Sequence, residues 1–371
     1  MKYGFFVVVF SIFAALFGYV GLRGWQSLAL YPSARPVYLI VYLLLFACSM
    51  VGLIFGDSMP LPLSKIITFT GYSFLLVVAY LFLCFLLVDA VRLVNYLFHF
   101  APGGMTTFRF WSMMSGLLII SVAMIIGNYK FNHPKIVHLE LQSNKPLQKK
   151  EMKIVAASDI HLGNDIDKNY LKKYVRLIND QQPDIILLAG DICDRSLKPL
   201  IHQKMNEELE NLKAPLGVYA IPGNHEYYTE NFQKTLQFYE SAGIKVLTDS
   251  VLLVNDSFYL AGRKDRMDKN RKKLSTLLST FAADKPVILL DHQPSALNEA
   301  VQNNVDLQLS GHTHEGQVFP ANLIVKWVFE AGYGYYKKGK THLYVSSGLG
   351  LWGPPYRIGT QSEIVVVNFK Y

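Results

Sequence analysis

The sequence predicts an α/β domain preceded by an all-α region of four transmembrane helices. Two features support this division: charged residues are distributed unevenly, and the spacing of apolar residues changes near residue 130. Residues 1–127 hold six of the 36 Lys and Arg residues and two of the 28 Asp and Glu residues. The later residues carry the charge of a soluble domain. This composition excludes a disordered chain and a collagen-like repeat.

Four uncharged apolar runs are each long enough to cross a bilayer. A hydrocarbon core of about 30 Å requires about 20 helical residues. The runs cover residues 4–22, 37–56, 66–88 and 110–127. A signal peptide is the alternative for the first run, but that run lacks a small-residue cleavage site. Residues 91–101 are expected to lie along the membrane interface as an amphipathic stretch.

An even number of spans places the N-terminus and the polar domain on the same side of the membrane. The basic residues near the spans divide almost equally, with Lys2, Lys65, Lys130, Lys135 and Lys145 on one side and Arg23, Arg35, Arg92 and Arg109 on the other. This division gives a slight preference for a cytoplasmic polar domain in a multi-pass protein of the cell membrane. The runs contain no ionisable residue, which favours an anchor over a transporter or channel.

Net charge and cysteine content exclude a nucleic-acid partner and cysteine-based sites. The net charge of +8 is shared between the two parts, and no basic stripe is interleaved with aromatic residues, so no nucleic acid is expected as a partner. Three cysteines, two of them in apolar runs, exclude a disulfide framework and a Cys-based zinc site. We expect Cys193 to be a small buried residue. The sequence leaves the oligomeric state unknown.

From residue 152 onward, short β-rich runs alternate with helix-like segments. Strands are expected at residues 153–157, 185–189, 218–222, 251–254, 259–260, 287–290, 307–310, 342–345 and 364–368. Helices are expected at residues 170–179, 202–212 and 231–242. This order is typical of an α/β sandwich whose loops carry the chemistry. We therefore expect a membrane anchor at residues 1–129, a linker with an edge strand at 130–150 and a folded domain at 151–371.

Five polar motifs directly follow predicted strands. They are Asp159-Ile160-His161, Gly190-Asp191-Ile192-Cys193-Asp194-Arg195, Gly223-Asn224-His225-Glu226, Asp291-His292 and Gly311-His312-Thr313-His314. Five of the ten histidines lie in these motifs. Because loops at strand ends can bring side chains from separate strands together, we expect the motifs to form one site.

The residue types in these motifs indicate a site for two metal ions. Asp, Asn and His offer the oxygen and nitrogen ligands that suit Mn²⁺, Fe or Zn²⁺. A carboxylate can bridge two cations about 3.5–4 Å apart. His312 and His314 point to opposite sides of an extended chain, so one loop can serve both ions. Without cations, carboxylates and imidazoles gathered in this way would repel and desolvate one another.

At these motifs the chain resembles the calcineurin-like metallophosphoesterase superfamily. The ordered signature of that superfamily is D-x-H, G-D-x-x-D, G-N-H-[E/D], a single His and G-H-x-H, and all five elements occur here in order. The resemblance covers residues 150–371. It implies an αββα sandwich of two mixed sheets, so residues 151–371 are expected to form a metallophosphoesterase domain. It also implies a hydrolase that cleaves phosphodiester or pyrophosphate bonds.

The resemblance implies a role for each motif residue. The first metal would be held by Asp159, His161, Asp191 and His314. The second would be held by Asp191, Asn224, His292 and His312, with Asp191 as the bridge. His225 would bind the phosphoryl group and protonate the leaving oxygen, Asp194 would orient His225, and Arg195 would contact phosphate. The implied cofactors are two divalent ions, Mn²⁺ first, with Fe, Zn²⁺ or Mg²⁺ as alternatives.

The C-terminal tail suggests a substrate class. The segment VSSGLGLWGPPYR at residues 345–357 is similar to a membrane-associated bacterial branch of the superfamily, which is related to UDP-2,3-diacylglucosamine hydrolases. Gln361-Ser362 and the four spans depart from that branch. The implied partners are the lipid bilayer and a phosphoester substrate, for which a lipid-linked compound is a candidate. The aromatic residues at 327–336 would then form either ordinary packing or an apolar rim for a lipid tail.

Other residues and functions have less specific interpretations. Asp265 and Asp268, near Arg263 and Arg266, are expected to form a solvated face. A metal-binding scaffold or regulatory membrane protein without catalysis is the alternative function, but the presence of His225 counts against it. The remaining histidines are expected to be structural; they are His99, His133, His138, His202 and His342.

Overall fold

The structure is a computed structural model that describes residues 2–100, 105–143, 145–147, 151–279, 281 and 284–370, with side chains from residue 11 onward. Its internal contacts divide the chain into two units. One consists of Met1–Ile126 with Gly353–Pro355, and the other of Gly127–Trp352 with Tyr356–Tyr371. We call them the membrane unit and the sandwich unit.

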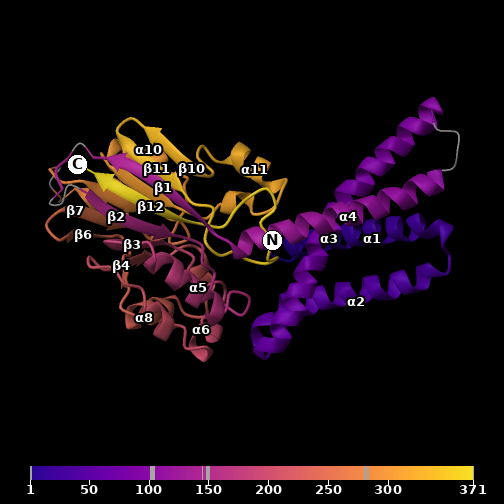
Figure 1. The fold of residues 1–371 in the computed structure, drawn as a ribbon, viewed down its shortest axis with the longest axis horizontal. Helices are drawn as coiled ribbons and strands as arrows, with labels where there is room; N and C mark the ends of the chain where they lie inside the picture. Colours follow the sequence, from indigo (N-terminus) through magenta and orange to yellow (C-terminus); the bar gives the residue numbers. More distant parts are fainter. Residues whose placement is uncertain are drawn as a thin grey trace. The chain divides into compact units, whose positions relative to one another are not determined.

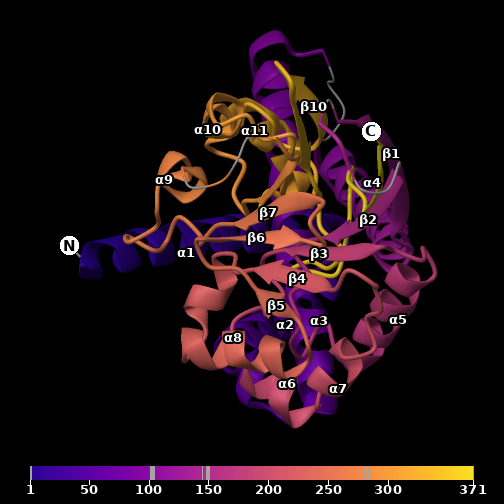
Figure 2. The ribbon, with the colours of Figure 1, turned by 90° about the vertical axis from the view of Figure 1, so that its left-hand side faces the viewer.

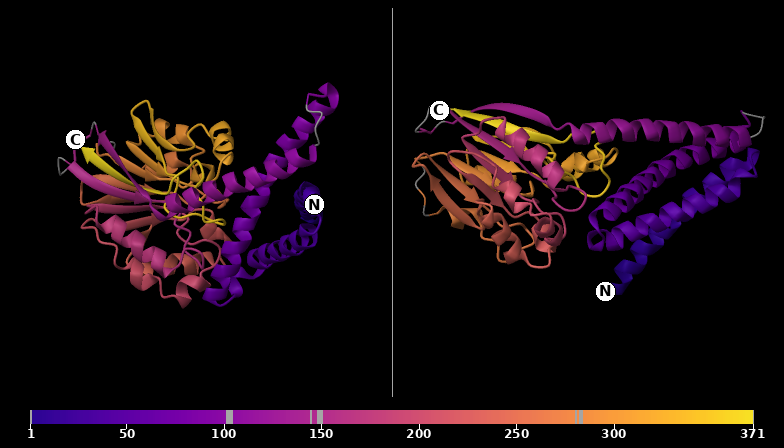
Figure 3. Two further views of the ribbon diagram at one scale, coloured as in Figure 1. Left: turned by 45° about the vertical axis from the view of Figure 1, so that its right-hand side comes forward. Right: turned by 60° about the horizontal axis from the view of Figure 1, so that its bottom comes forward.

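The membrane unit consists of long apolar helices (Figure 3). They are α1 (Lys2–Ser27), α2 (Ala34–Phe55), α3 (Leu61–Phe98) and α4 (Met105–Asn132), with 3-10 turns η1 (Leu28–Leu30) and η2 (Gly56–Ser58) after the first two. Three segments are long and apolar enough to cross a membrane: Ala34–Ser58, Leu61–Phe98 and Met105–Asn132. The predicted first span lies in α1, where side chains before residue 11 fall outside the described residues. The number of four spans and their orientation therefore remain predictions.

The expected interfacial stretch belongs to a longer helix as far as residue 98, because α3 continues without a break to Phe98. Its position at the membrane interface stays a prediction. The sequence offers no Pro or Gly between residues 88 and 98 to end the helix. The helix ends only where His99 adopts a left-handed φ of 49°.

Helices α2 and α3 approach closely because small residues face each other. A Cβ atom added to Gly71 would lie 2.8 Å from the Cα atom of Ser49. The hydroxyl of Ser49 donates a 3.1 Å hydrogen bond to the carbonyl oxygen of Gly71. Small residues of this kind let apolar helices pack where lipid offers no hydrophobic driving force.

The sandwich unit contains two mixed six-stranded sheets. The first has the order β1-β12-β2-β3-β4-β5 and the second β10-β11-β9-β8-β7-β6. The first-sheet strands are β1 (Lys135–Gln142), β2 (Glu151–Ala157), β3 (Ile185–Ala189), β4 (Val218–Ile221), β5 (Lys245–Val246) and β12 (Glu363–Lys370). The second-sheet strands are β6 (Ser250–Val254), β7 (Phe258–Gly262), β8 (Val287–Leu290), β9 (Leu307–Ser310), β10 (Gly334–Lys338) and β11 (Thr341–Val345).

Helices cover both outer faces of the sandwich (Figures 1 and 2). On the outside of the first sheet lie α5 (Lys168–Asn179), α6 (Lys198–His202), α7 (Asn206–Leu209) and α8 (Phe232–Ser241). On the outside of the second sheet lie α9 (Leu274–Leu278) and α10 (Leu297–Gln302). Short turns η3 (His225–Tyr228) and η4 (His314–Gly316) and the helix α11 (Ala321–Val328) complete the unit.

The alternation of side chains along the strands explains this layering. In β2, Ile154 and Ala156 pack into the core between the two sheets, whereas Val155 and Ala157 pack under the helices of the first sheet. Successive side chains of a strand face opposite sides, so an all-apolar strand fits a sheet that is buried on both faces. Each such strand can then deliver its next polar residues to one edge of the sandwich.

Three local expectations differ from the structure. The predicted helix at 202–212 is two short helices, α6 and α7, because Lys204 adopts a left-handed φ of 50° between them. The short strand β5 and the edge strand β10 were not expected. The expected solvated face is also wrong in part, since Asp265 and Arg263 are only 0% and 4% exposed.

Candidate metal centre

The five polar motifs meet where β2, β3, β4, β8 and β9 end. All residues of β3, β4, β8 and β9 are buried. Burial fixes the register of each strand, so the loop that follows it begins at a fixed place. The backbone joins the loops directly: the Asp159 amide donates to the Gly190 carbonyl and the Gly311 amide donates to the His292 carbonyl, at 3.0 and 2.9 Å. The first bond joins the loops after β2 and β3, and the second joins the loops after β8 and β9.

The first cluster of ligand-type side chains contains Asp159, His161 and His314. The Nε2 atom of His314 lies 3.2 Å from Asp159 Oδ1. The Nε2 atoms of His161 and His314 are 3.0 Å apart. All three residues are buried, and their ligand atoms lie within 4.8 Å of one another, so the cluster could hold a metal ion.

The second cluster contains Asp191, His292 and His312, whose ligand atoms also lie within 4.8 Å of one another. His292 Nε2 is 3.1 Å from Asp191 Oδ2. Asn224 joins this cluster, because its Oδ1 atom lies 2.7 Å from His312 Nδ1. His312 and His314 therefore face different clusters, as their spacing in the sequence predicts.

Asp191 lies between the two clusters. Its Oδ2 atom is 3.1 Å from His292 Nε2 and 3.9 Å from His161 Nε2. It also forms a third metal-compatible group with His161 and His225. The structure therefore brings all seven predicted ligand residues together, with one carboxylate in reach of both clusters.

His225 lies beside these clusters and is held by Asp194. Its Nδ1 atom is 2.8 Å from the Asp194 carbonyl oxygen and 3.1 Å from the carboxylate Oδ1. With Nδ1 engaged, Nε2 is the ring atom left for a reacting group. Arg195 is adjacent, and its Nε donates a 3.1 Å hydrogen bond to Asp194 Oδ2. The three predicted catalytic residues thus lie together at the edge of the site.

The charges around these side chains favour opposite protonation states for two histidines. Burial lowers the pKa of His225, but the hydrogen bond that its ring donates to Asp194 and the charges of Asp191 and Asp194 outweigh it and raise that pKa to about 9. His225 is therefore a proton donor at neutral pH. Burial and the nearby His161 and Arg357 lower the pKa of His314 well below its ordinary value. This direction favours the neutral imidazole of His314 at neutral pH.

The loops of the site hold an unusual number of left-handed residues. Positive φ angles occur at Asp159, His161, Asp191, His312 and His314, at 53°, 54°, 52°, 73° and 50°. Each such residue costs about 1–3 kcal/mol, so the surrounding structure must hold it there. The motif glycines permit this crowding: a Cβ on Gly311 would lie 2.1 Å from Asp159 Oδ2, and one on Gly223 would lie 2.1 Å from Asp191 Oδ1.

Glu226 is a positioning residue to which the sequence analysis gave no role, although it stands inside the third motif. Its carboxylate is fully buried and accepts five hydrogen bonds. The donors are the amides of Asp191, Ile192, Cys193 and Gly223 and the hydroxyl of Tyr239. The carboxylate therefore fixes the loop that carries Asp191 to the loop that carries Asn224.

Replacing Glu226 with Ala is expected to lower the free energy of unfolding by about 3 kcal/mol or more, because buried donors lose their acceptor. Thermal unfolding of the full-length protein in detergent, followed by near-ultraviolet circular dichroism, measures the change. Glu240→Ala, on the exposed surface of α8, is the matched control and should leave the transition in place. A Glu226→Ala melting curve that overlays the wild-type curve would disprove the positioning role.

Arg357 is a second positioning residue, for which the sequence alone predicts no role. It is completely buried, and its guanidinium donates to the carbonyl oxygens of His314, Gly348 and Gly350, at 3.0, 3.1 and 2.6 Å. Burial lowers its pKa to about 10, so it stays charged at neutral pH. Arg357 thus ties the C-terminal tail to the loop of His314. Its place in the tail motif was the signal that could have indicated this.

Ion pairs and hydrogen bonds explain why Arg263 and Asp265 are buried, although they were expected on a solvated face. Its Nη1 lies 3.2 Å from Asp291 Oδ2 and 2.7 Å from Glu299 Oε2. Arg271 also pairs with Asp291 at 2.5 Å. Asp265 accepts hydrogen bonds from Gln293 Nε2 at 2.9 and 3.0 Å. These contacts surround the Asp291-His292 motif and fix its position.

The donor set fits divalent metal ions. Within the described residues, His292 Nε2, the ring atom that faces Asp191, is buried without a well-formed hydrogen bond. Buried polar atoms are otherwise almost always paired, because leaving one unpaired costs about 1–3 kcal/mol. Nitrogen and carboxylate oxygen atoms directed to a shared point are the ligands of Mn²⁺, Fe and Zn²⁺.

Comparison with known proteins also indicates a metal-dependent class of protein. Residues 152–316 match the calcineurin-like phosphoesterase family. An uncharacterized metallophosphoesterase of Campylobacter jejuni is 30% identical over 98% of this chain and 97% of its own length. An uncharacterized metallophosphoesterase of Aquifex aeolicus is 32% identical over 67% of this chain and 98% of its own. A transmembrane protein with metallophosphoesterase domain from Danio rerio is 32% identical to this chain. The match covers 68% of this chain and 62% of that relative.

The chain therefore belongs to the calcineurin-like metallophosphoesterase family. Its two mixed sheets with flanking helices are the calcineurin-like fold, and its class of activity is that of a metal-dependent phosphoesterase. The apolar helices and the relatives described as transmembrane proteins indicate association with a membrane.

Proposed function

We propose that this protein is a membrane-anchored phosphohydrolase that uses two divalent ions, with Mn²⁺ the first candidate, to cleave phosphodiester or pyrophosphate bonds. The observation that carries the proposal is the position of Asp191, in reach of both clusters of ligand-type side chains. The first ion would be held by Asp159, His161, Asp191 and His314. The second would be held by Asp191, Asn224, His292 and His312.

The chain's own residues supply the remaining chemistry. Bound divalent ions supply positive charge that stabilises a phosphoryl group as it is transferred. His225, protonated at neutral pH, donates its Nε2 proton to the leaving oxygen. Asp194 holds the ring by Nδ1 and stabilises its positive charge. Arg195, a partly exposed side chain beside Asp194, would contact a non-bridging phosphate oxygen.

The activity test uses the full-length protein in detergent with Mn²⁺ against a panel of phosphodiesters and pyrophosphates. Turnover of at least one of these classes is expected, with loss after metal chelation and recovery after Mn²⁺ is restored. Binding of metal without hydrolysis of any member would instead favour the scaffold function.

A lipid-linked phosphoester is the substrate class that we propose. The helix α11, described in full, buries none of its eight residues. Its exposed apolar side chains are Leu323, Ile324, Trp327 and Val328, and Trp327 is 87% exposed. The next residue, Phe329, has its ring 6.5 Å from the ring of His312. An apolar surface this close to the site can receive a hydrocarbon chain, in keeping with the resemblance of the tail to the branch related to UDP-2,3-diacylglucosamine hydrolases.

The aromatic stretch at 327–336 therefore divides between its two expected roles. Tyr333 donates to Glu363 Oε2 at 3.0 Å and Tyr335 Oη lies 2.8 Å from His342 Nδ1, so both belong to the packing of the sandwich. Trp327 has no such contact among the described residues and lies open to solvent.

Replacing Trp327 and Leu323 together with Ala is expected to reduce kcat/KM for a diacylglycerol-linked pyrophosphate about tenfold or more. The reason is that a large apolar side chain contributes about 1.5–3 kcal/mol when it is fully buried, here by the hydrocarbon chain of the substrate. Hydrolysis of water-soluble bis(p-nitrophenyl) phosphate should change less than twofold. Ile201→Ala, an exposed apolar residue of α6, is the control. Equal losses on the two substrates would remove the lipid-linked proposal and leave the phosphohydrolase proposal intact.

A further inference from the structure

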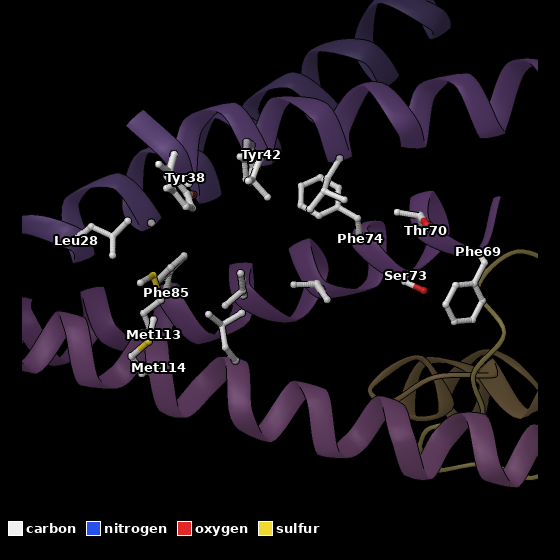
Figure 4. Close-up of a pocket in the computed structure, with 17 residues that line it drawn as sticks. Leu28, Tyr38, Tyr42, Phe69, Thr70, Ser73, Phe74, Phe85, Met113 and Met114 are labelled. Carbon is white, nitrogen blue, oxygen red and sulfur yellow. The ribbon is translucent and has the colours of Figure 1, made fainter. Parts of the chain in front are cut away.

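The membrane unit contains a partly open apolar cavity of about 600 Å³. Residues of α2, α3 and α4 and of the end of α1 line it (Figure 4). Leu28, Tyr38, Phe85 and Met113 lie at one end, and Phe69 and Ser73 at the other. Ligand sites typically measure about 300–1,000 Å³. A methylene group is about as large as a water molecule, so a chain of about 16 carbons would occupy roughly 500 Å³.

The same unit holds four arginines, one from each helix, and two of them pair with a single carboxylate. Arg23 Nη2 lies 2.6 Å from Asp89 Oδ2, and Arg92 Nη1 lies 2.8 Å from Asp89 Oδ1. The charge of Arg109 interacts with those of the other three arginines and with Asp89. Arg35 stacks on the ring of Trp25, with 5.5 Å from Cζ to the ring centroid. We call these four arginines with Asp89 the arginine cluster.

The arginine cluster lies at one end of the cavity. Residues three or four apart on a helix share a face, and three charged residues of the cluster stand at this spacing from a cavity-lining residue on their own helix. The pairs are Arg35 with Tyr38, Asp89 with Phe85, and Arg109 with Met113. These three lining residues lie together at the same end of the cavity in Figure 4.

Among the described residues, the positive charge of the cluster exceeds its negative charge. Four guanidinium groups and one carboxylate make up the cluster, and two of the guanidinium groups pair with that carboxylate, which leaves a net charge of about +3. The Nε atoms of Arg23, Arg35 and Arg109 are buried and have no acceptor within the described part of the chain. Guanidinium groups bind phosphate oxygens strongly and often through two parallel hydrogen bonds.

We propose that the cavity and the arginine cluster form one binding site for a lipid with an anionic, phosphate-bearing headgroup. One hydrocarbon chain of the lipid occupies the cavity, and its phosphate contacts the arginines. The site is built entirely from the membrane unit and shares no residue with the metal centre. It therefore does not depend on the proposed hydrolytic function.

The test measures lipid retained by the full-length protein. Protein reconstituted in nanodiscs of equal phosphatidylglycerol and phosphatidylcholine is extracted into mild detergent and weighed by native mass spectrometry. The wild type should retain one phosphatidylglycerol per chain in preference to phosphatidylcholine. Arg35→Gln with Arg109→Gln should lower that retention about 25-fold, from about fivefold for each basic residue. Val77→Trp, which fills the cavity, should abolish retention of both lipids.

Two variants serve as matched controls. Lys65→Gln removes a positive charge near the start of α3, away from the cluster, and Val122→Trp enlarges an exposed position of α4. Both should retain phosphatidylglycerol as the wild type does. Circular dichroism of every variant separates loss of binding from loss of folding.

Three results would overturn the lipid site. The first is equal retention of the two lipids by the wild type. The second is calorimetric binding of inorganic phosphate by the cluster with no lipid retained and no effect of Val77→Trp, which would assign the arginines to a free anion. The third is a wild-type dimer without lipid that Val77→Trp converts to a monomer, which would assign the cavity to a second copy of the chain.

Discussion

Replacement of Asp191 with Asn should lower phosphodiester hydrolysis at least about 1,000-fold, because about 4 kcal/mol of transition-state stabilisation depends on the metal ions. The Asn amide has the shape of the Asp carboxylate but no negative charge, so the contacts with His292 and His161 lose that charge. Metal content should fall from two ions per chain to one or none. Steady-state rates on bis(p-nitrophenyl) phosphate with Mn²⁺, together with elemental analysis of the same samples, measure both effects.

Asp256→Asn is the matched control for this substitution. Asp256 is exposed in the turn between β6 and β7, and its left-handed φ of 49° suits Asn equally well. It should leave rate and metal content unchanged. An Asp191→Asn enzyme that keeps both ions and more than a tenth of the activity would contradict the bridging role of Asp191.

Replacement of His225 with Ala should separate proton donation from metal binding. For a substrate with an alkoxide leaving group, kcat should fall about 100- to 10,000-fold, the usual contribution of a general acid. For a p-nitrophenyl ester the loss should be less than about tenfold, since that leaving group needs no proton. Metal content should stay at two ions. Rates across a series of esters that differ in leaving-group pKa measure the contrast.

His202→Ala, at an exposed position in α6, is the control and should not alter the rates. Equal losses across the whole ester series would rule out proton donation and leave His225 with phosphoryl binding alone. Loss of metal in His225→Ala would instead make His225 a ligand, as its group with His161 and Asp191 permits geometrically.

Strands and motif positions could be predicted from the sequence because they follow local rules. The strands β3, β8 and β9 occupy the residues that the sequence predicts. A strand that is apolar on both faces must be buried on both, so the first polar residue after it marks a sheet edge. The convergence of Asp159, Asp191 and His312 follows from that order.

Features that depend on long-range contacts could not be predicted in this way. Arg263 reads as a surface residue in sequence, but its partners Asp291 and Glu299 are about 30 residues away and become neighbours only in the fold. Glu226 was visible in a motif, but five donors converge on it only after folding. The arginine cluster was visible only as four basic residues predicted to share one side of the membrane.

The most direct test of the two-ion site is anomalous diffraction at the manganese edge from crystals of the full-length protein grown with MnCl₂. Two peaks should appear about 3.5–4 Å apart, with Asp191 between them, Asp159, His161 and His314 around one, and Asn224, His292 and His312 around the other. A single peak, or two peaks that Asp191 does not contact, would contradict this site and the two-ion chemistry proposed from it.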